Sequence, residues 1–477
     1  MPIPFVLEYL NCTNQLTKEI QDKAMQYIAT GYVRQLGFKR WDGTFSAFGQ
    51  SDREGSSWLT ALTFYTFEKI KSITFVDPDV QNQALIALQR MQDSQTGCFR
   101  ATGNLFHGDL KGGADNEVSF TAYVAILLSE SNYPAAPTLL RGALSCLDAA
   151  SRRDQSLYNI ALMFNAFGVS GNLERRNAML AQLKSKAIQQ DGAIHWERPD
   201  KPKAEKYPFF FAPSPSAEIE MTAYVLLGMT RGPTPSQDDL SYMAQIALWL
   251  ARQQNSRGGY RSTADTVVAL QALAKYSCLV YKADTSITIK VTSQNTEIAQ
   301  FKVQPDNRLL VQKKPLPRVP GDYRLDVSGK GCSLIQSSVQ YNIPVQKQDS
   351  AFSVSVKIPP GSCTGGVAYT IPINITVSYQ GLHNQSNMAI VDLKLLSGYT
   401  VDYQSLVQLR QKVSKAEQVN NRLVMYLESV SRNPVSLSVT LEMSNRVQNF
   451  QPQFVYVYDY YEADENGVSV IKHPCSK

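Results

Sequence analysis

The chain has 477 residues and a modest formal net charge of +6, and its 47 basic residues are scattered rather than clustered. A nucleic-acid-binding function therefore has no electrostatic footprint in this sequence. No run of 18 apolar residues occurs, so the sequence predicts no membrane span.

A turn that joins a glycine to an aromatic residue recurs four times across roughly the first 260 residues of the chain. It reads WDGTF at 41–45, GCFR at 97–100, DGAIHW at 191–196 and GGYR at 258–261. The glycines at 43, 97, 192 and 258 are 54, 95 and 66 residues apart, so the period is roughly 50 if one copy has decayed in the middle interval. A unit of that length cannot bury its apolar face alone, which predicts a stacked or closed array.

Helices of two kinds are predicted between these turns. Residues 58–70, 121–128, 222–229 and 266–273 are nearly continuous apolar runs, as in helices that are buried on most sides. Residues 79–92, 177–190 and 238–254 are more amphipathic. Buried and partly exposed helices that alternate around a ring form an α/α toroid, and we predict one, built from helical-hairpin repeats, over residues 1–282.

After Tyr281 the apolar period changes to two, which is typical of strands with one buried face. The alternation is clearest at 286–291, 352–356 and 436–441. We predict a short β-rich region at 284–346 and a β-sandwich at 350–477. Its strands are expected near 351–358, 367–379, 387–396, 422–428, 434–443 and 453–461, with one helix near 403–415. The predicted fold class is therefore multidomain, a toroid followed by β-rich parts.

Seven cysteines and three Asn-X-Ser/Thr sequons, at Asn11, Asn374 and Asn384, indicate a secreted, extracellular glycoprotein. No Cys-X-X-Cys spacing occurs, and we expect neither a metal site nor a cofactor. The first ten residues have no features of a signal peptide. Because a secreted chain needs one, we expect further sequence, including the signal peptide, upstream of Met1.

Five motifs of this chain resemble those of the alpha-macroglobulin family of protease inhibitors, the relatives of complement proteins. They are GGADNEV at 112–118, HWERP at 195–199, NMAIVD at 387–392, VYDYYE at 457–462 and PCSK at 474–477. The resemblance covers essentially the whole chain. It implies a thioester-type domain at 1–282, the second half of a CUB domain at 284–346 and a macroglobulin receptor-binding domain at 350–477. It also implies inhibition of endopeptidases, serine proteases among them, rather than an enzymatic activity.

The chain departs from the family at its reactive centre. Family members carry a Gly-Cys-Gly-Glu-Gln motif whose Cys and Gln form an internal thioester, an acyl group activated by its thiolate leaving group. No cysteine here is followed by glycine, and the resemblance places Met1 a few residues downstream of the motif. The bait region that proteases cleave is also missing. We therefore expect the C-terminal part of an inhibitor, unable by itself to trap a protease, with the target proteases and oligomeric state of the parent left open.

The resemblance implies acyl-transfer chemistry for two residues of the parent. His107 matches the position of a complement histidine that attacks the thioester and passes the acyl group to hydroxyls. Neutral imidazole is a competent nucleophile near pH 7. Asp109 matches an acidic residue that could orient the ring. The alternative is that His107 is a solvated loop histidine.

Other polar candidates are interpreted as structural. His195 and Trp196 follow an Asp-Gly turn and are expected to belong to a packing cluster of the repeated turns. The acidic pairs Asp238–Asp239 and Glu218/Glu220 are expected at solvated or helix-capping positions.

Cysteine pairing is also implied by the resemblance. The implied pairs are Cys98–Cys146 within the toroid and Cys363–Cys475 in the last domain. Cys332 matches a position whose partner lies in the missing half of the CUB domain, so we expect it to be unpaired here. Cys12 and Cys278 match no pairing and stay unassigned.

The implied partners are proteases, through the parent, and an endocytic receptor of the LDL-receptor type. Family members present two lysines on a helix of the last domain to such receptors, whose acidic pockets clamp the ammonium groups. Tyr403 and Val407 occupy those positions here, and the nearby Arg410, Lys412 and Lys415 are the candidates to replace them. The alternative is an ordinary solvated basic helix end.

Two other functions stay open. The first is a secreted binding module without inhibitory activity. The second is an enzyme on an α/α toroid, such as a terpenoid cyclase or prenyltransferase, although the sequence shows neither an aspartate-rich motif nor a zinc-ligand set. An unpaired half-CUB is also expected to expose a strand edge and to lower the solubility of the chain when expressed alone.

Overall fold

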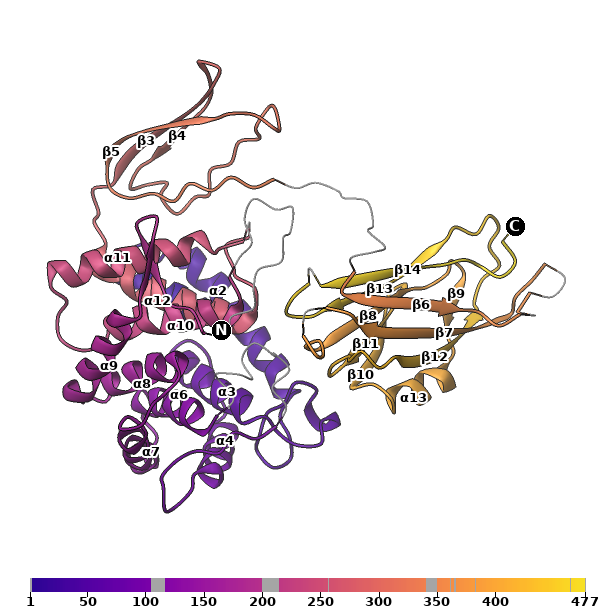
Figure 1. Ribbon diagram of the computed structural model, residues 1–477, viewed down its shortest axis with the longest axis horizontal. Coiled ribbons are helices and arrows are strands. Elements are labelled where there is room, and N and C mark those ends of the chain that lie inside the picture. Colours follow the sequence, from indigo (N-terminus) through magenta and orange to yellow (C-terminus); the bar gives the residue numbers. More distant parts are fainter. Residues whose placement is uncertain are drawn as a thin grey trace.

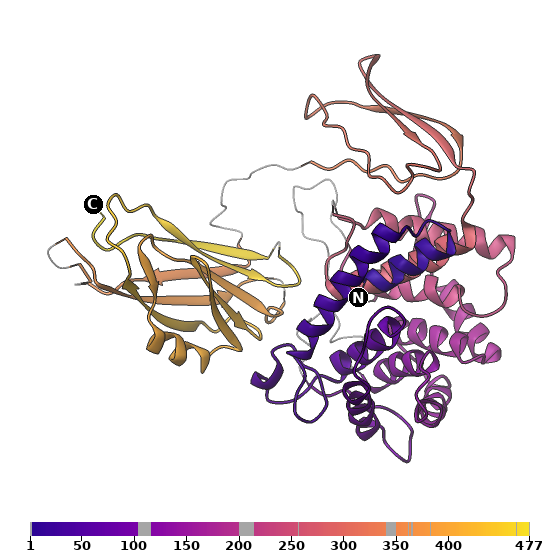
Figure 2. The same ribbon diagram turned by 180° about the vertical axis from the view of Figure 1, so that it is seen from behind.

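The computed structural model describes residues 2–103, 116–199, 214–255, 257–339, 350–360, 362–363, 366–381, 383–463 and 465–476. It has three parts that follow one another along the chain: a helical body, a small three-stranded sheet and a β-sandwich (Figure 1). The sandwich lies beside the helical body, and the small sheet lies beyond one end of it (Figures 1 and 2).

Helices of the helical body alternate between inner and outer positions. The inner helices are α1 (Pro2–Cys12), α3 (Ser57–Ile70), α6 (Glu117–Ser129), α8 (Leu157–Val169), α10 (Ser216–Met229) and α12 (Thr263–Val280). The outer helices are α2 (Lys18–Leu36), α4 (Pro78–Met91), α7 (Ala136–Ala150), α9 (Leu173–Ser185) and α11 (Gln237–Arg252). Helices α6 and α8 are buried over most of their length, and every residue of α10 is buried. The predicted α/α toroid is confirmed.

Two short elements complete the toroid. Residues of η1 (Gly49–Ser51) form one turn of 3-10 helix. Strands β1 (Ile188–Gln190) and β2 (Ala193–His195) form an antiparallel hairpin around the Asp191-Gly192 turn. The helix predicted to run to residue 190 therefore ends earlier, at Ser185, because residues 188–190 pair with β2 instead.

The recurring turns share one construction. Gly43, Gly97, Gly192 and Gly258 all have φ between 74° and 86°, a conformation that glycine adopts without steric cost. After each glycine, the N–H of an aromatic residue donates to a threonine hydroxyl of the next inner helix. The pairs are Phe45–Thr60 at 2.9 Å, Phe99–Thr121 at 2.8 Å, Trp196–Thr222 at 3.3 Å and Tyr260–Thr266 at 3.0 Å. The segment between α7 and α8 also connects an outer helix to the next inner helix, but it contains no glycine. It therefore corresponds to the missing copy of the turn.

The first and last inner helices close the ring. Phe5 of α1 lies 6.5 Å from Tyr65 of α3 between ring centroids, and α1 also lies beside α12. A disulfide joins Cys12, at the end of α1, to Cys278 in α12. The two cysteines that the sequence left unassigned therefore pair with each other across the closure of the ring.

The small sheet has the order β4–β3–β5 and is antiparallel throughout. Its strands are β3 (Ser286–Ser293), β4 (Thr296–Val303) and β5 (Arg324–Lys330). Every residue of β5 is exposed, including Leu325 and Val327. Within the described residues β5 is an edge strand of this sheet.

Two antiparallel sheets form the sandwich. The larger sheet contains, in order, β10 (Lys415–Val419), β11 (Arg422–Leu427), β8 (Ala389–Lys394), β13 (Gln453–Asp459) and β14 (Asn466–Ile471). The smaller contains β6 (Phe352–Lys357), β7 (Thr370–Tyr379), β12 (Val435–Met443) and β9 (Tyr399–Val401). Alternate residues of both sheets fill the core between them, among them Ile373, Ile375, Val391, Leu393 and Val457.

Three strands and one helix end differ from the prediction. Strands β9, β10 and β14 are not among the predicted strands. Strand β9 has three residues and β10 (KAEQV) is mostly polar. Strand β14 (NGVSVI) has the alternating pattern of the predicted strands and was missed. Helix α13 (Tyr403–Arg410) ends before the predicted residue 415. The N–H groups of Gln411 and Lys412 turn back to carbonyls of the helix, and Lys415 already pairs with Tyr426 as the first residue of β10.

Candidate functional site

The residues implied in acyl transfer, His107 and Asp109, lie in the segment 104–115, outside the described part of the chain. The start of α1 is described. Since the resemblance places the thioester motif a few residues before Met1, the surroundings of Pro2 form the candidate site.

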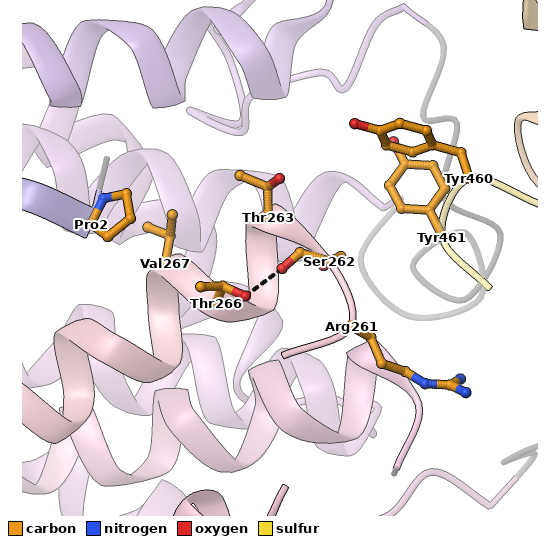
Figure 3. Close-up of a pocket in the computed structure, with 8 residues that line it drawn as sticks. All are labelled: Pro2, Arg261, Ser262, Thr263, Thr266, Val267, Tyr460 and Tyr461. Atoms are coloured by element: carbon orange, nitrogen blue, oxygen red, sulfur yellow. Dashed lines mark hydrogen bonds between the residues drawn. The ribbon is translucent and has the colours of Figure 1, made fainter. Parts of the chain in front are cut away.

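A pocket of about 390 Å³ lies between the toroid and the sandwich at the N-terminal ends of α1 and α12 (Figure 3). Its toroid wall consists of Pro2, Arg261, Ser262, Thr263, Thr266 and Val267. Its other wall consists of Tyr460 and Tyr461, in the turn after β13. Figure 3 shows the two tyrosine rings projecting from the sandwich toward the start of α12. The pocket is therefore bounded partly by aromatic rings from a different domain.

The toroid wall is held by the last of the four recurring turns. Ser262 caps α12, since its hydroxyl accepts the N–H of Asp265. The Thr266 hydroxyl donates to the Ser262 carbonyl at 2.6 Å and accepts the Tyr260 N–H. The turn that repeats around the toroid thus positions one side of the pocket.

The sandwich wall is held by one buried carboxylate, that of Asp459. It accepts the backbone N–H of Asn387 at 2.8 Å and the side-chain amide of Asn387 at 3.1 Å. It also accepts the N–H groups of Tyr461 and Glu462, at 2.9 and 3.0 Å. Burial raises the pKa of Asp459, and these hydrogen bonds oppose that rise. Two of the motifs that carry the family resemblance, at 387–392 and 457–462, therefore meet in a single anchor for the tyrosine turn.

Direct contacts between the two domains flank the pocket. Arg261 and Glu462 form an ion pair with 3.4 Å between Nη1 and Oε1. Phe48 packs edge-on against Tyr426 of β11, with ring centroids 5.7 Å apart. Burial raises the pKa of Tyr426 to about 12, so its hydroxyl stays neutral. The pocket lies beside these contacts, between the two domains.

Behind the toroid wall lies a network of buried acids and tyrosines. The Tyr158 hydroxyl donates to Glu220 Oε2 at 2.7 Å, and within the described residues Glu220 Oε1 has no hydrogen-bond partner. Burial raises the pKa of Glu220 to about 8, so this carboxyl is largely protonated at neutral pH. Burial and the proximity of Glu220 also raise the pKa of Tyr123 and Tyr224. The inner helices thus surround the protonated carboxyl of Glu220 with tyrosine side chains.

The interpretation of Glu218 and Glu220 as solvated or capping residues is wrong. Both are buried, because α10 is surrounded on all sides and has no solvated face. Arg198 donates to the Glu218 carboxylate from its backbone N–H at 3.3 Å, from Nε at 2.8 Å and from Nη2 at 3.2 Å. Asp239, by contrast, completes a capping box with Ser236 at the start of α11.

The HWERP segment packs against the toroid. His195 stacks on Trp249 with 4.8 Å between ring centroids and 5° between ring planes. Trp196 is fully buried and donates its indole N–H to the Leu183 carbonyl at 2.8 Å. Together with Arg198 these side chains fasten the segment to three helices, which is the role of a packing cluster.

The remaining cysteines and the sequons fall as follows. The structure joins Cys98 to Cys146 and Cys363 to Cys475, and Cys332 is free and exposed. Asn11, Asn374 and Asn384 are exposed. In the first sequon the Thr13 hydroxyl is buried and donates to the Tyr9 carbonyl.

The three basic residues proposed near the receptor helix have different surroundings. Arg410 donates its Nε–H to the Ala416 carbonyl at 3.0 Å. Lys415 pairs with Glu417 at 2.7 Å and lies over the Tyr426 ring. Lys412 lies beyond the end of α13, and its side chain is exposed. Of the three, Lys412 presents its charge most openly.

Within the described residues no group of three or more His, Cys, Asp or Glu side chains could hold a metal ion. No described helix is long and apolar enough to cross a membrane. Three disulfides fit an extracellular protein.

A disulfide-closed helical toroid, followed by a three-stranded sheet and a β-sandwich, defines a multidomain protein of the complement and macroglobulin class. The family model for the A-macroglobulin TED domain matches residues 1–276, and the model for the A-macroglobulin receptor binding domain matches residues 384–472. The chain belongs to the alpha-macroglobulin family, as a C-terminal part of such a protein.

Among curated proteins the chain is similar to ovostatin from Gallus gallus, with 38% identity over 480 residues. The match covers 99% of this chain and 32% of ovostatin. The chain therefore spans about a third of the length of this relative.

The VYDYYE motif carries the family resemblance, but the sequence alone indicates no role for its tyrosines. The signal that could have found them is the pair Tyr460-Tyr461, two adjacent aromatic residues just past the end of a strand. Their relation to the start of α1 is not encoded locally, because Pro2 and Tyr460 lie at opposite ends of the chain.

Proposed function

We propose that this chain is the C-terminal part of an endopeptidase inhibitor of the alpha-macroglobulin type, which traps proteases through an internal thioester. In this proposal residues 1–282 form the thioester-type domain, residues 284–346 the second half of the CUB domain and residues 350–477 the receptor-binding domain. The bait region and the thioester belong to the parent protein, which is secreted.

The pocket beneath Tyr460 and Tyr461 is the observation that carries this proposal. Pro2 lines it, and the resemblance places the thioester motif a few residues before Met1. A thioester at that position would lie between α12 and two tyrosine rings. Exclusion of water and amines from such a site would keep an activated acyl group from reacting before a protease arrives.

His107 and Asp109 have a role in the same proposal. In the parent, His107 would accept the acyl group from the thioester and pass it to a hydroxyl, while Asp109 would orient the imidazole. His107→Asn in the full-length parent is expected to abolish ester formation and to retain direct reaction with amines. Ester formation that persists in this variant would remove His107 from the reaction.

The first experiment asks whether the parent exists. Peptide mass spectrometry of the native protein from secreted fluid is expected to find peptides upstream of Met1 that contain Cys-Gly-Glu-Gln. A native protein without them would exclude thioester trapping and would favour the non-inhibitory secreted binding module.

The second experiment tests the shield directly in the full-length parent. Tyr460→Ala combined with Tyr461→Ala is expected to speed the reaction of the uncleaved protein with methylamine several-fold, measured as release of a free thiol. Tyr456→Ala is the matched control, since this tyrosine lies on β13, just before the turn that carries Tyr460 and Tyr461, and outside the pocket. An unchanged rate in the double variant would show that the tyrosines shield nothing.

Receptor binding is proposed through Lys412. Acidic receptor pockets bind an ammonium group whose charge is available, and Arg410 and Lys415 are already engaged within the sandwich. Lys412→Ala is expected to weaken binding to an LDL-receptor-type ectodomain about tenfold or more, and Lys415→Ala less. Equal affinity of the Lys412 variant and the wild type would refute this assignment.

The enzyme alternative has less support. Catalysis in an α/α toroid needs an open interior, whereas tyrosines from α6, α8 and α10 gather around Glu220 inside this one. For glycosylation we propose Asn374 foremost, because it and Thr376 both lie on the outer face of β7. Treatment with an N-glycanase followed by peptide mass spectrometry tests that assignment.

A further inference from the structure

One histidine of the sandwich is buried at the end of the chain. His473 follows β14 and is 3% exposed. Its ring stacks face to face on Phe450, in the loop between β12 and β13, with centroids 3.5 Å apart and planes 4° apart. Two residues further on, Cys475 forms the disulfide with Cys363. The ring therefore lies where the C-terminal segment is fastened to the sandwich.

The hydrogen bonds of His473 form a directed chain. Its Nδ1 accepts the backbone N–H of Cys475 at 3.1 Å. In the neutral ring the proton must then be on Nε2, which lies 2.7 Å from the Tyr399 hydroxyl oxygen and donates to it. The Tyr399 hydroxyl in turn donates to the Ala368 carbonyl at 2.6 Å. Every bond in this chain is satisfied by the neutral imidazole.

Among the described residues that line its surroundings, no acidic side chain faces the ring. His473 and Tyr399 line a second pocket, of about 460 Å³, together with segments 366–368, 446–450 and 475–476. The one charged side chain among the lining residues is that of Arg446, which has the same sign as an imidazolium. Lys472, the preceding residue, is exposed and also positive. Burial lowers the pKa of His473 accordingly.

We propose that His473 is a pH-sensitive contact, called the clasp below, at the C-terminal end of the sandwich. At neutral pH it holds the segment 474–476 and the loop 446–450 beside Tyr399, and at acidic pH it opens. Protonation turns Nδ1 from an acceptor into a donor, so it faces the Cys475 N–H as a second donor and that hydrogen bond is lost. The segment 474–476 and the loop 446–450 then separate from Tyr399, and the pocket they line widens. The Cys363–Cys475 disulfide keeps the chain tethered, so the opening is local and reversible. This device goes beyond the proposed inhibitor function and does not depend on it.

The direction of the pH dependence follows from linkage. Folding holds the ring neutral, whereas the unfolded chain protonates near the ordinary histidine pKa of about 6.5. The clasp therefore contributes its full stability above that pH and loses it as the pH falls. The change lies in the range of acidified compartments, about pH 5 to 6.

Hydrogen exchange of the full chain, measured by mass spectrometry at about pH 7.5 and about pH 5.5 and corrected for intrinsic exchange rates, tests the clasp. Peptides covering 366–369, 444–451 and 472–476 are expected to lose about tenfold in protection at the lower pH. Peptides of β7 and β12, which share a sheet with the Tyr399 strand β9, should keep the same protection at both pH values. Equal protection of the clasp peptides at both pH values would overturn the proposal.

Variants separate the clasp from a general acid effect. His473→Gln keeps one acceptor and one donor but cannot be protonated, so its clasp peptides should show the same protection at both pH values. His383→Gln, which removes a histidine of the same sandwich outside this pocket, should retain the wild-type response. A pH response that survives in His473→Gln would contradict the assignment.

Disulfide reduction provides a readout that needs no variant. In the wild-type chain, a phosphine reductant should open Cys363–Cys475 faster at the lower pH, relative to Cys98–Cys146 in the same molecule. A constant ratio of the two rates would oppose the clasp.

Discussion

Closure of the toroid by Cys12–Cys278 can be tested quantitatively. The two cysteines are 266 residues apart, and removal of such a cross-link by Cys12→Ser with Cys278→Ser should cost about 5–6 kcal/mol in the loop-entropy treatment. The cysteines of Cys98–Cys146 are 48 residues apart, which corresponds to about 4 kcal/mol. Because the cost grows with the logarithm of loop length, the ring-closing pair should matter more, by about 1.5 kcal/mol.

The assay uses a feature of the composition. All four tryptophans lie in the toroid, at positions 41, 58, 196 and 249, so tryptophan fluorescence in a urea titration reports on the toroid and not on the sandwich. Hydrogen exchange of α1 provides a local measurement, in which the double-serine variant should lose protection first. Removal of Cys363–Cys475 is the control, and it should leave the fluorescence transition unchanged.

One result would refute this reasoning. If the Cys12/Cys278 variant loses no more stability than the Cys98/Cys146 variant, and α1 keeps its protection, the ring is held closed by packing alone. The burial of Phe5, Leu7 and Leu10 against the toroid core would then suffice to dock α1.

Three further predictions concern buried polar groups of the toroid. The pKa of Glu220 in the folded protein is about 8, above the ordinary carboxyl value of 4.5. Its proton therefore stabilises the fold fully below pH 4.5, and this contribution is lost as the pH rises to 8. The free energy of unfolding of the toroid should fall by about a few kcal/mol over that pH range, and Glu220→Gln should remove this pH dependence. Urea titrations in which the wild type and the variant lose the same stability over the range would contradict the prediction. Arg198→Met leaves the Glu218 charge buried and unpaired and should cost about 3–5 kcal/mol, part of which Glu218→Gln in the same chain should restore. A loss below about 1 kcal/mol in the single variant would mean that the pair is solvated. Thr121→Val keeps the side-chain shape but leaves the Phe99 N–H without its acceptor, at an expected cost of about 1–3 kcal/mol, whereas Thr121→Ser should be milder; equal stability of both variants would argue against the hydroxyl.

The architecture was predictable from the sequence because its signals are local. A glycine with positive φ followed by an aromatic residue marks each recurring turn, and continuous or alternating apolar runs mark buried helices and half-buried strands. The prediction weakened where an element is short or polar. Strand β10 reads KAEQV and becomes a strand only because β11 pairs with it.

The buried acids show what local sequence patterns cannot predict. Glu218 and Glu220 are ordinary acidic residues in sequence, and nothing beside them indicates that α10 is enclosed on every side. The protonation of Glu220 and the ion pair of Glu218 follow from that enclosure, since removal from water penalises a charge that has no partner.

Local pattern therefore determined the kinds of element in this chain and their order: helical hairpins first, then strands. The tertiary structure decided which distant residues share a site. Cys12 meets Cys278, Asp459 binds Asn387, and Tyr460 faces Pro2 across the domain boundary. Each of these pairings depends on how the ring closes and how the sheets stack, and contacts between residues so far apart are set by the packing of whole elements rather than by the conformation of the residues beside them.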